Sequence, residues 1–207
     1  MADRVPLDLG EPASARRKGC ATGFVVLVFG AAVGGLAGLV AGRTAGLIAF
    51  VVVAVLLGVL VWAMASRTVW LEGTTVVART ITRRSVDLVT AERLELLVTD
   101  VRGARTIGIL VGSGRRSVSM SLAVYSGTGG RELGILVLRK LADIFATSEN
   151  TAGLVFSELL VAQLRAEAKG EAAPDRPLYQ LASVAPAGRL AQRLKPEAVT
   201  RFVASLD

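Results

Sequence analysis

The chain has 207 residues, of which 52% are hydrophobic, and a formal net charge of +7. This length allows one domain of ordinary size together with a membrane anchor. The chain has no histidine and a single cysteine, Cys20. This composition excludes histidine-based acid–base catalysis, His- and Cys-rich metal sites and any disulfide within the chain. We therefore expect no enzyme, no catalytic residue, no metal and no cofactor.

The first 19 residues combine two prolines with mixed charge and show no apolar period. Such a segment buries too little apolar surface to fold by itself. We therefore predict a flexible cytoplasmic tail over residues 1–19.

Residues 20–66 contain two uncharged runs, at about 23–42 and 46–66, separated by residues 43–45. At about 1.5 Å per residue, each run reaches roughly 30 Å, the hydrocarbon thickness of a bilayer. We therefore predict a transmembrane hairpin. Two buried core helices would need a much larger soluble body, and a cleaved signal peptide would not be followed at once by a second span.

Basic residues flank the outer ends of the two runs. Arg16, Arg17 and Lys18 precede the first run and Arg67 follows the second, whereas the connection carries only Arg43. Positive charge gathers on the cytoplasmic side of membrane proteins. The pattern predicts a multi-pass protein of the cell membrane with both termini in the cytoplasm.

Small residues line one face of each run and allow close helix packing. The expected packing residues are Gly30, Gly34, Gly38 and Gly42 on the first run, and Ala54 and Gly58 on the second. The face can serve packing within the hairpin, or it can serve self-association into a homo-oligomer or pore assembly. Neither run contains an ionisable residue that would line a polar pathway.

From Thr68 to about Tyr125 the sequence alternates and is rich in β-branched residues, which predicts about six short strands. Ser117–Val124 is the clearest, with serines alternating with apolar residues. A helical period begins near Arg131. We predict an α+β domain over residues 67–147, an antiparallel meander or small barrel capped by helices.

A helical extension is predicted over residues 148–207. Its first helix should run from about Ala152 to Ala168, followed by a proline-containing linker at Gly170–Pro177. The end, roughly Ala187 to Leu206, is weakly helical, and Pro196 suits a first helical position there.

The β region resembles the bacterial PH-like domains that follow paired transmembrane helices in small membrane proteins. The chain's Ala-, Arg-, Gly- and Val-rich composition is typical of GC-rich bacteria such as actinobacteria. The resembling residues are Val76-Val77-Ala78-Arg79, Arg83-Arg84, Val86-Asp87-Leu88 and Leu94 to Val98. Two features depart from the family: six strands are predicted where it has seven, and about 60 residues are added after the first helix. The resemblance implies a cytoplasmic binding or scaffold domain and no enzyme.

If the strands form a simple up-and-down meander, alternate turns return to the membrane. These turns carry Arg83 with Arg84, and Arg102 with Arg105, while Arg67 already lies there. Each basic residue near an anionic leaflet contributes about 1 kcal/mol of attraction. We therefore predict that these five arginines face the headgroups of the anionic inner leaflet, with ordinary solvated turns as the alternative.

Gly127–Gly130 precedes a helix, as phosphate-binding loops do, but lacks the Gly-Lys-Ser/Thr ending and the G-x-G-x-x-G spacing. Arginines are scattered and aromatic residues few, so no nucleic acid is expected. The function that remains is a membrane-anchored, non-enzymatic cytoplasmic module that binds a protein or lipid. The alternative is an accessory or oligomeric subunit of a membrane transport or pore assembly, packed through the glycine face of the first helix.

Overall fold

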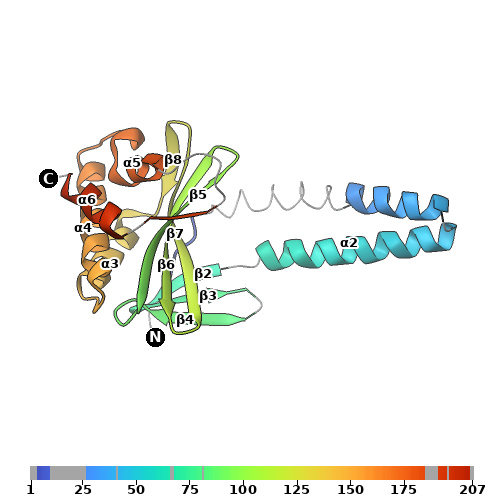
Figure 1. The fold of residues 1–207 in the computed structure, drawn as a ribbon, viewed down its shortest axis with the longest axis horizontal. Coiled ribbons are helices and arrows are strands. Elements are labelled where there is room, and N and C mark those ends of the chain that lie inside the picture. The colour runs from blue at the N-terminus through green and yellow to red at the C-terminus, as the bar shows by residue number, and fades with distance from the viewer. Residues whose placement is uncertain are drawn as a thin grey trace. The chain divides into compact units, whose positions relative to one another are not determined.

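The computed structural model describes seven stretches of the chain (Figure 1). They are residues 4–9, 27–40, 42–65, 68–80, 82–184, 191–194 and 196–205. The chain divides into two compact units. One unit joins Met1–Leu9 to Thr68–Asp207, and the other is Gly10–Arg67. The larger unit is an α+β fold with two antiparallel sheets, as the strand and helix periods predicted.

The first sheet, which we call sheet A, has the strand order β1-β2-β3-β4, and every neighbouring pair is antiparallel. Its strands are β1 (Arg4–Pro6), β2 (Thr68–Glu72), β3 (Thr75–Arg79) and β4 (Arg83–Asp87). The second, sheet B, has the order β8-β7-β6-β5-β9. Its strands are β5 (Arg93–Val101), β6 (Ala104–Ser113), β7 (Arg116–Ser126), β8 (Gly129–Glu132) and β9 (Gln192–Leu194).

Strand β1 comes from the segment that was expected to be a flexible tail. Pro6 lies opposite Trp70 of β2, and the Leu7 N–H donates to the Val69 carbonyl oxygen at 2.9 Å. The Leu7 side chain is only 2% exposed. The tail prediction is therefore wrong for residues 4–9, because the short alternation of Val5, Leu7 and Leu9 finds an open sheet edge to pair with. The rest of residues 1–19 lies outside the described stretches.

The break between β4 and β5 shows that the strands do not form a simple meander. β4 belongs to sheet A and β5 to sheet B, and β4 packs against β6 and β7. Eight strands, β1 to β8, precede the first helix of this unit in the described part of the chain, and seven of them, β2 to β8, follow residues 10–67. Besides β1, the strand added to the six predicted ones is β8, which falls where the sequence predicted a glycine-rich loop.

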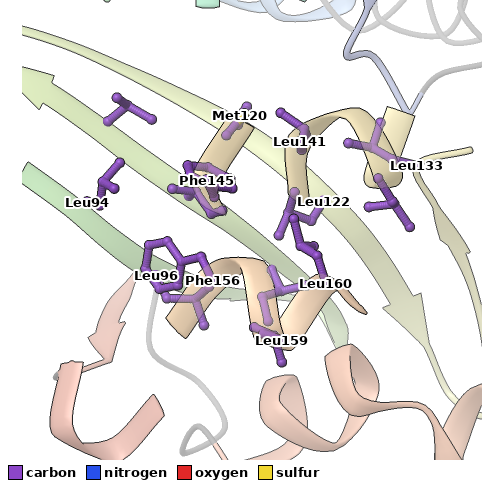
Figure 2. Packing of buried hydrophobic residues seen from close by; sticks show 14 of the residues in the cluster. Leu94, Leu96, Met120, Leu122, Leu133, Leu141, Phe145, Phe156, Leu159 and Leu160 are labelled. Atoms are coloured by element: carbon purple, nitrogen blue, oxygen red, sulfur yellow. The ribbon is translucent and has the colours of Figure 1, made fainter. Parts of the chain in front are cut away.

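Helices cover the core of the larger unit (Figure 2). They are α3 (Ile135–Ala146), α4 (Thr151–Ala168), the 3₁₀ turn η1 (Ala173–Asp175), α5 (Pro177–Val184) and α6 (Pro196–Ala204). Asn150 starts α4, because its side-chain oxygen accepts the Ala152 N–H at 3.0 Å. Phe145 of α3 and Phe156 of α4 meet edge to face, with their ring centroids 5.9 Å apart.

The C-terminal extension over residues 148–207 belongs to this same unit. Leu178 of α5 and Val199 of α6 are buried in the common core. β9, which was not predicted, pairs with β5 so that Leu194 lies opposite Leu96. α6 does begin at Pro196, as expected. The extension therefore completes the core and covers one edge of sheet B.

The smaller unit contains two apolar helices, Leu27–Val40 and α2 (Arg43–Ala65). α2 begins three residues before the predicted run at 46. Among the described residues, α2 is the one helix that is long and apolar enough to cross a bilayer by length and composition. Residues 23–26, 41 and 66 of the two predicted runs lie outside the described part.

Candidate functional site

The two apolar helices pack through small residues. A Cβ atom placed on Gly34 would lie 2.6 Å from Phe50 Cβ and 2.9 Å from the Gly46 carbonyl oxygen. A Cβ on Gly30 would lie 3.7 Å from Ala54 Cβ. Since residues nearer the start of one helix meet residues farther along the other, the helices are antiparallel. Gly30, Gly34 and Ala54 therefore lie at the contact between the helices, where the sequence placed a packing face.

The other predicted packing residues differ in whether they lie at the contact between the helices. A Cβ on Gly38 would be 3.6 Å from Gly46 Cα, which places Gly38 in the contact as well. A Cβ on Gly42, which has φ +89°, or on Gly58 would meet no atom of the described residues within 4 Å. Gly46 is a contact residue that the glycine spacing did not predict, because a Cβ there would lie 2.6 Å from the Gly34 carbonyl oxygen. The sequence feature that could have identified Gly46 is its small size at the start of the second run, opposite the glycines of the first run.

The outer faces of this helix pair carry large apolar side chains. Leu39 is 86% exposed and Leu56 is 65% exposed. Only 6% of the apolar stretch Arg43–Val61 is buried within the structure. A core helix of a soluble protein would be mostly buried, so this surface needs an apolar medium or partner around it.

Three arginines lie at the β3–β4 end of sheet A, which we call the basic end: Arg79, Arg83 and Arg84. Arg79 is directly opposite Arg83 in the β3–β4 register, and Arg84 is opposite Ala78. All three are exposed. Among the described residues, the side chains of Arg79 and Arg84 have no ion-pair or hydrogen-bond partner. Arg67, also predicted for this surface, is outside the described residues.

Trp70 lies on the outer face of sheet A between two guanidinium groups. The Arg4 and Arg83 guanidinium carbons are 5.8 and 5.9 Å from its ring centroid. Both arginines also pair with Glu72, Arg4 at 3.5 Å and Arg83 at 3.0 Å. The Trp70 Nε1 atom is buried without a hydrogen-bond partner among the described residues. Both guanidinium groups are close enough to the ring for cation–π attraction.

Of the two arginines predicted for the membrane surface in the β5–β6 turn, Arg105 has partners within the larger unit. Arg102 is exposed, with φ +53°, in the turn itself. Arg105 Nε pairs with Asp100 at 3.7 Å, and its Nη1 donates to the Ser183 carbonyl oxygen at 3.2 Å. Because Ser183 lies in the last turn of α5, Arg105 caps that helix end with positive charge. The turn belongs to sheet B, so the simple meander that assigned Arg102 and Arg105 to the basic end does not hold.

A cavity of about 370 Å³ lies beside Arg105. It is lined by Asp100, Gly103, Arg105, Tyr125, Gly127, Tyr179, Ala182 and Ser183. Its polar groups already bind one another: Tyr179 donates to the Gly127 carbonyl oxygen at 3.0 Å, and Arg105 is held by Asp100 and Ser183.

Tyr125, which lines this cavity, belongs to a polar network with Glu132 and Arg176. The Tyr125 hydroxyl donates to Glu132 at 2.6 Å, and Arg176 binds the other oxygen of Glu132, also at 2.6 Å. Burial raises the pKa of the Tyr125 phenol far above its ordinary value, and the hydrogen bond to Glu132 raises the pKa further. Tyr125 therefore stays protonated and acts as a structural donor.

The glycine-rich segment forms a hairpin and not a loop that enters a helix. Gly127, at φ +59°, and Thr128 connect β7 to β8, and Ser126 lies opposite Gly129. A side chain at Gly130 would run into the Tyr125 ring, which covers this glycine across the strands. The glycines are thus explained by a tight turn and a cross-strand aromatic contact.

The described residues contain no group of three acidic, histidine or cysteine side chains that could hold a metal ion. Comparison with protein families, with characterised proteins and with solved structures gives no match for this chain. Its function must therefore be inferred from its own geometry.

Proposed function

We propose that this chain is a membrane-anchored, non-enzymatic cytoplasmic module that binds or scaffolds another molecule. The observation that carries this proposal is the pairing of β1 with β2. Residues 4–9 and 68–205 belong to one folded unit, although residues 10–67 separate them. Both flanks of the separating segment must then lie on one side of any membrane, so the segment crosses twice or does not cross.

The exposed apolar surface of the smaller unit favours crossing twice. Leu39, Leu56 and their neighbours would be costly to expose to water, at about 25 cal/mol for each Å² of apolar surface. Glycines that let two backbones approach, here with Phe50 packed over them, and large apolar side chains outside are typical of helices packed in lipid. Arg43 at the connection and the more strongly basic flanks favour cytoplasmic termini.

The larger unit supports the resemblance to PH-like domains. Its seven consecutive strands β2 to β8, followed by α3, agree with the strand number of that family, whereas β1 is an eighth strand and a departure from it. The elements after α3 remain a departure, since α4, α5 and α6 contribute to the common core. A PH-like domain on a two-helix anchor would serve as a binding or scaffold module for anionic lipid or for a second protein.

The alternative, an oligomeric subunit of a transport or pore assembly, needs the glycine face for contacts between chains. Gly30, Gly34 and Gly38 instead contact α2 of the same chain. This use of the face favours the anchor. Crosslinking in native membranes separates the two functions, because a defined homo-oligomer would support the assembly and contradict a monomeric anchored module.

The topology is tested by cysteine labelling of the full chain with Cys20 replaced by serine. Thr44→Cys places a thiol at the exposed connection between the helices, and Ser126→Cys places one on the exposed β7 end. A membrane-impermeant maleimide should label Thr44→Cys in intact cells, and Ser126→Cys only after permeabilisation. Equal labelling of both positions before permeabilisation would overturn the anchored cytoplasmic module.

A further inference from the structure

Like charges directly opposite each other destabilise a strand pair, and the basic end contains such a pair. Arg79 faces Arg83 in the β3–β4 register. Glu72 balances Arg83, but the Arg79 side chain has no described partner. An anion shared by the two guanidinium groups would remove the repulsion. Phosphate oxygens suit this role because guanidinium groups bind them with two parallel hydrogen bonds.

The position of the basic end along the chain indicates where such an anion would come from. α2 ends at Ala65, and β2 begins at Thr68. Three residues of extended chain reach at most about 11 Å, so the start of β2 stays close to the end of the apolar helix. Thr68 lies opposite Arg79, which places the basic end at that start. After β1 the chain also runs toward the basic end, since the Leu7 N–H donates to the carbonyl oxygen of Val69, the residue after Thr68.

Trp70 adds a second recognition element beside these arginines. It is two residues from Thr68 on β2, held between Arg4 and Arg83. Its Nε1 atom is buried, so only the partly exposed ring can reach a headgroup. Tryptophan rings are enriched at the level of lipid headgroups.

We infer that Arg79, Arg83, Arg84 and Trp70 form a docking surface for the phosphate groups of anionic lipids. Arg102 and Arg105 are not part of it. The inference rests on the proposed membrane anchor and names the lipid chemistry that the module recognises. Docking fixes the larger unit against the bilayer and leaves its remaining faces open to a protein partner.

The test uses the full chain in lipid nanodiscs with Trp62→Phe, so that Trp70 is the one tryptophan left in the sequence. Spin labels on the lipid headgroups quench Trp70 fluorescence when the ring approaches them. We expect stronger quenching in discs containing phosphatidylglycerol than in discs of phosphatidylcholine alone. The difference should vanish at about 1 M salt, where the Debye length falls to about 3 Å.

Arg79→Gln/Arg84→Gln removes two charges without touching Glu72 or Trp70. It should shift the ratio of docked to undocked protein by about 30-fold toward undocked in phosphatidylglycerol discs. Arg115→Gln/Arg116→Gln is the matched control, because it removes two exposed arginines from the β6–β7 turn. In this control, Trp70 fluorescence should be quenched as strongly as in the parent protein.

The outcomes separate the anchor from the docking surface. Failure of the full chain to enter nanodiscs would overturn the anchor. Entry with quenching that is independent of lipid charge, or an equal loss in both double variants, would overturn the docking surface and leave the anchor standing.

Discussion

The two units of this chain differ in where their large apolar side chains lie. In the helix pair, Gly34 and Gly46 lie at the contact while Leu56 faces outward. In the larger unit, Leu96 and Phe145 are fully buried, and charged residues occupy the surface. Burial of apolar surface drives folding in water, whereas close backbone packing drives helix association in lipid. The inversion is what the proposed function requires, with the helix pair in lipid and the larger unit in water.

Leu7→Ala should destabilise the larger unit more than any surface substitution. Leu7 is 2% exposed and anchors β1 in the core, so its truncation should lower the free energy of unfolding by about 4 kcal/mol. Thermal and denaturant unfolding of the detergent-solubilised chain measure this change. Leu154→Ala, at a leucine that is 52% exposed, is the control and should be nearly neutral. A similar loss for both would show that Leu7 of β1 does not pack into the core.

Leu56→Arg tests the outer face of the helix pair. A charged residue near the middle of a membrane helix costs about 3 kcal/mol on insertion, so the variant should appear in the soluble or degraded fraction. Leu136→Arg is the matched control, since Leu136 is an 81% exposed leucine on α3 of the larger unit. Membrane fractionation should show normal membrane recovery for the control. Normal recovery of Leu56→Arg would contradict a lipid-facing surface.

Gly34→Leu tests the contact between the helices. The added side chain meets Phe50 and the Gly46 backbone and should cost about 2 kcal/mol of helix association. Gly30→Cys/Ala54→Cys reports the pairing, because the 3.7 Å Cβ separation suits a disulfide. Oxidation in the absence of Cys20 should crosslink the helices efficiently, and Gly34→Leu should reduce the yield. Gly35→Leu should leave the yield unchanged, because a Cβ on Gly35 would meet no atom of the described residues within 4 Å.

Substitutions in the β5–β6 turn should have the smallest effect on the free energy of unfolding. Arg105→Gln should lower the free energy of unfolding by about 1 kcal/mol, because it removes the cap of α5 and the Asp100 pair. Arg102→Gln should leave stability within about 0.5 kcal/mol, since Arg102 is exposed in the turn. Unfolding of the two variants side by side checks this difference. Equal stability would show that Arg105 is an ordinary solvated arginine.

Periodicity predicted the elements whose side chains repeat over many residues. The alternation in Ser117–Val124 lies within β7, and the helices near 131–147 and 152–168 are present as α3 and α4. β1, β8 and β9 were missed because strands of three or four residues are too short for a period. They form only because an edge of a sheet is available to pair with them.

The helix contact and the turn arginines also show which features can be predicted from sequence spacing and which cannot. Glycine spacing predicted Gly34 at the helix contact, since one face of a helix follows from spacing alone. The role of Arg105 did not follow from the sequence, because α5 lies more than 70 residues farther along the chain and supplies its carbonyl partners. The partner of a charged residue depends on tertiary packing, which turn position does not reveal.

The central claim is that the segments on both sides of residues 10–67 belong to one folded unit. Arg4 lies opposite Glu72, so cysteines at these positions should form a disulfide in oxidised membranes of the Cys20→Ser chain. Arg4→Cys paired with Glu149→Cys, on the turn before α4, should not crosslink within the chain. We predict rapid intramolecular crosslinking for Arg4→Cys/Glu72→Cys. Absence of that crosslink, with both thiols reactive, would contradict the shared unit and remove its support for the proposed two-pass topology.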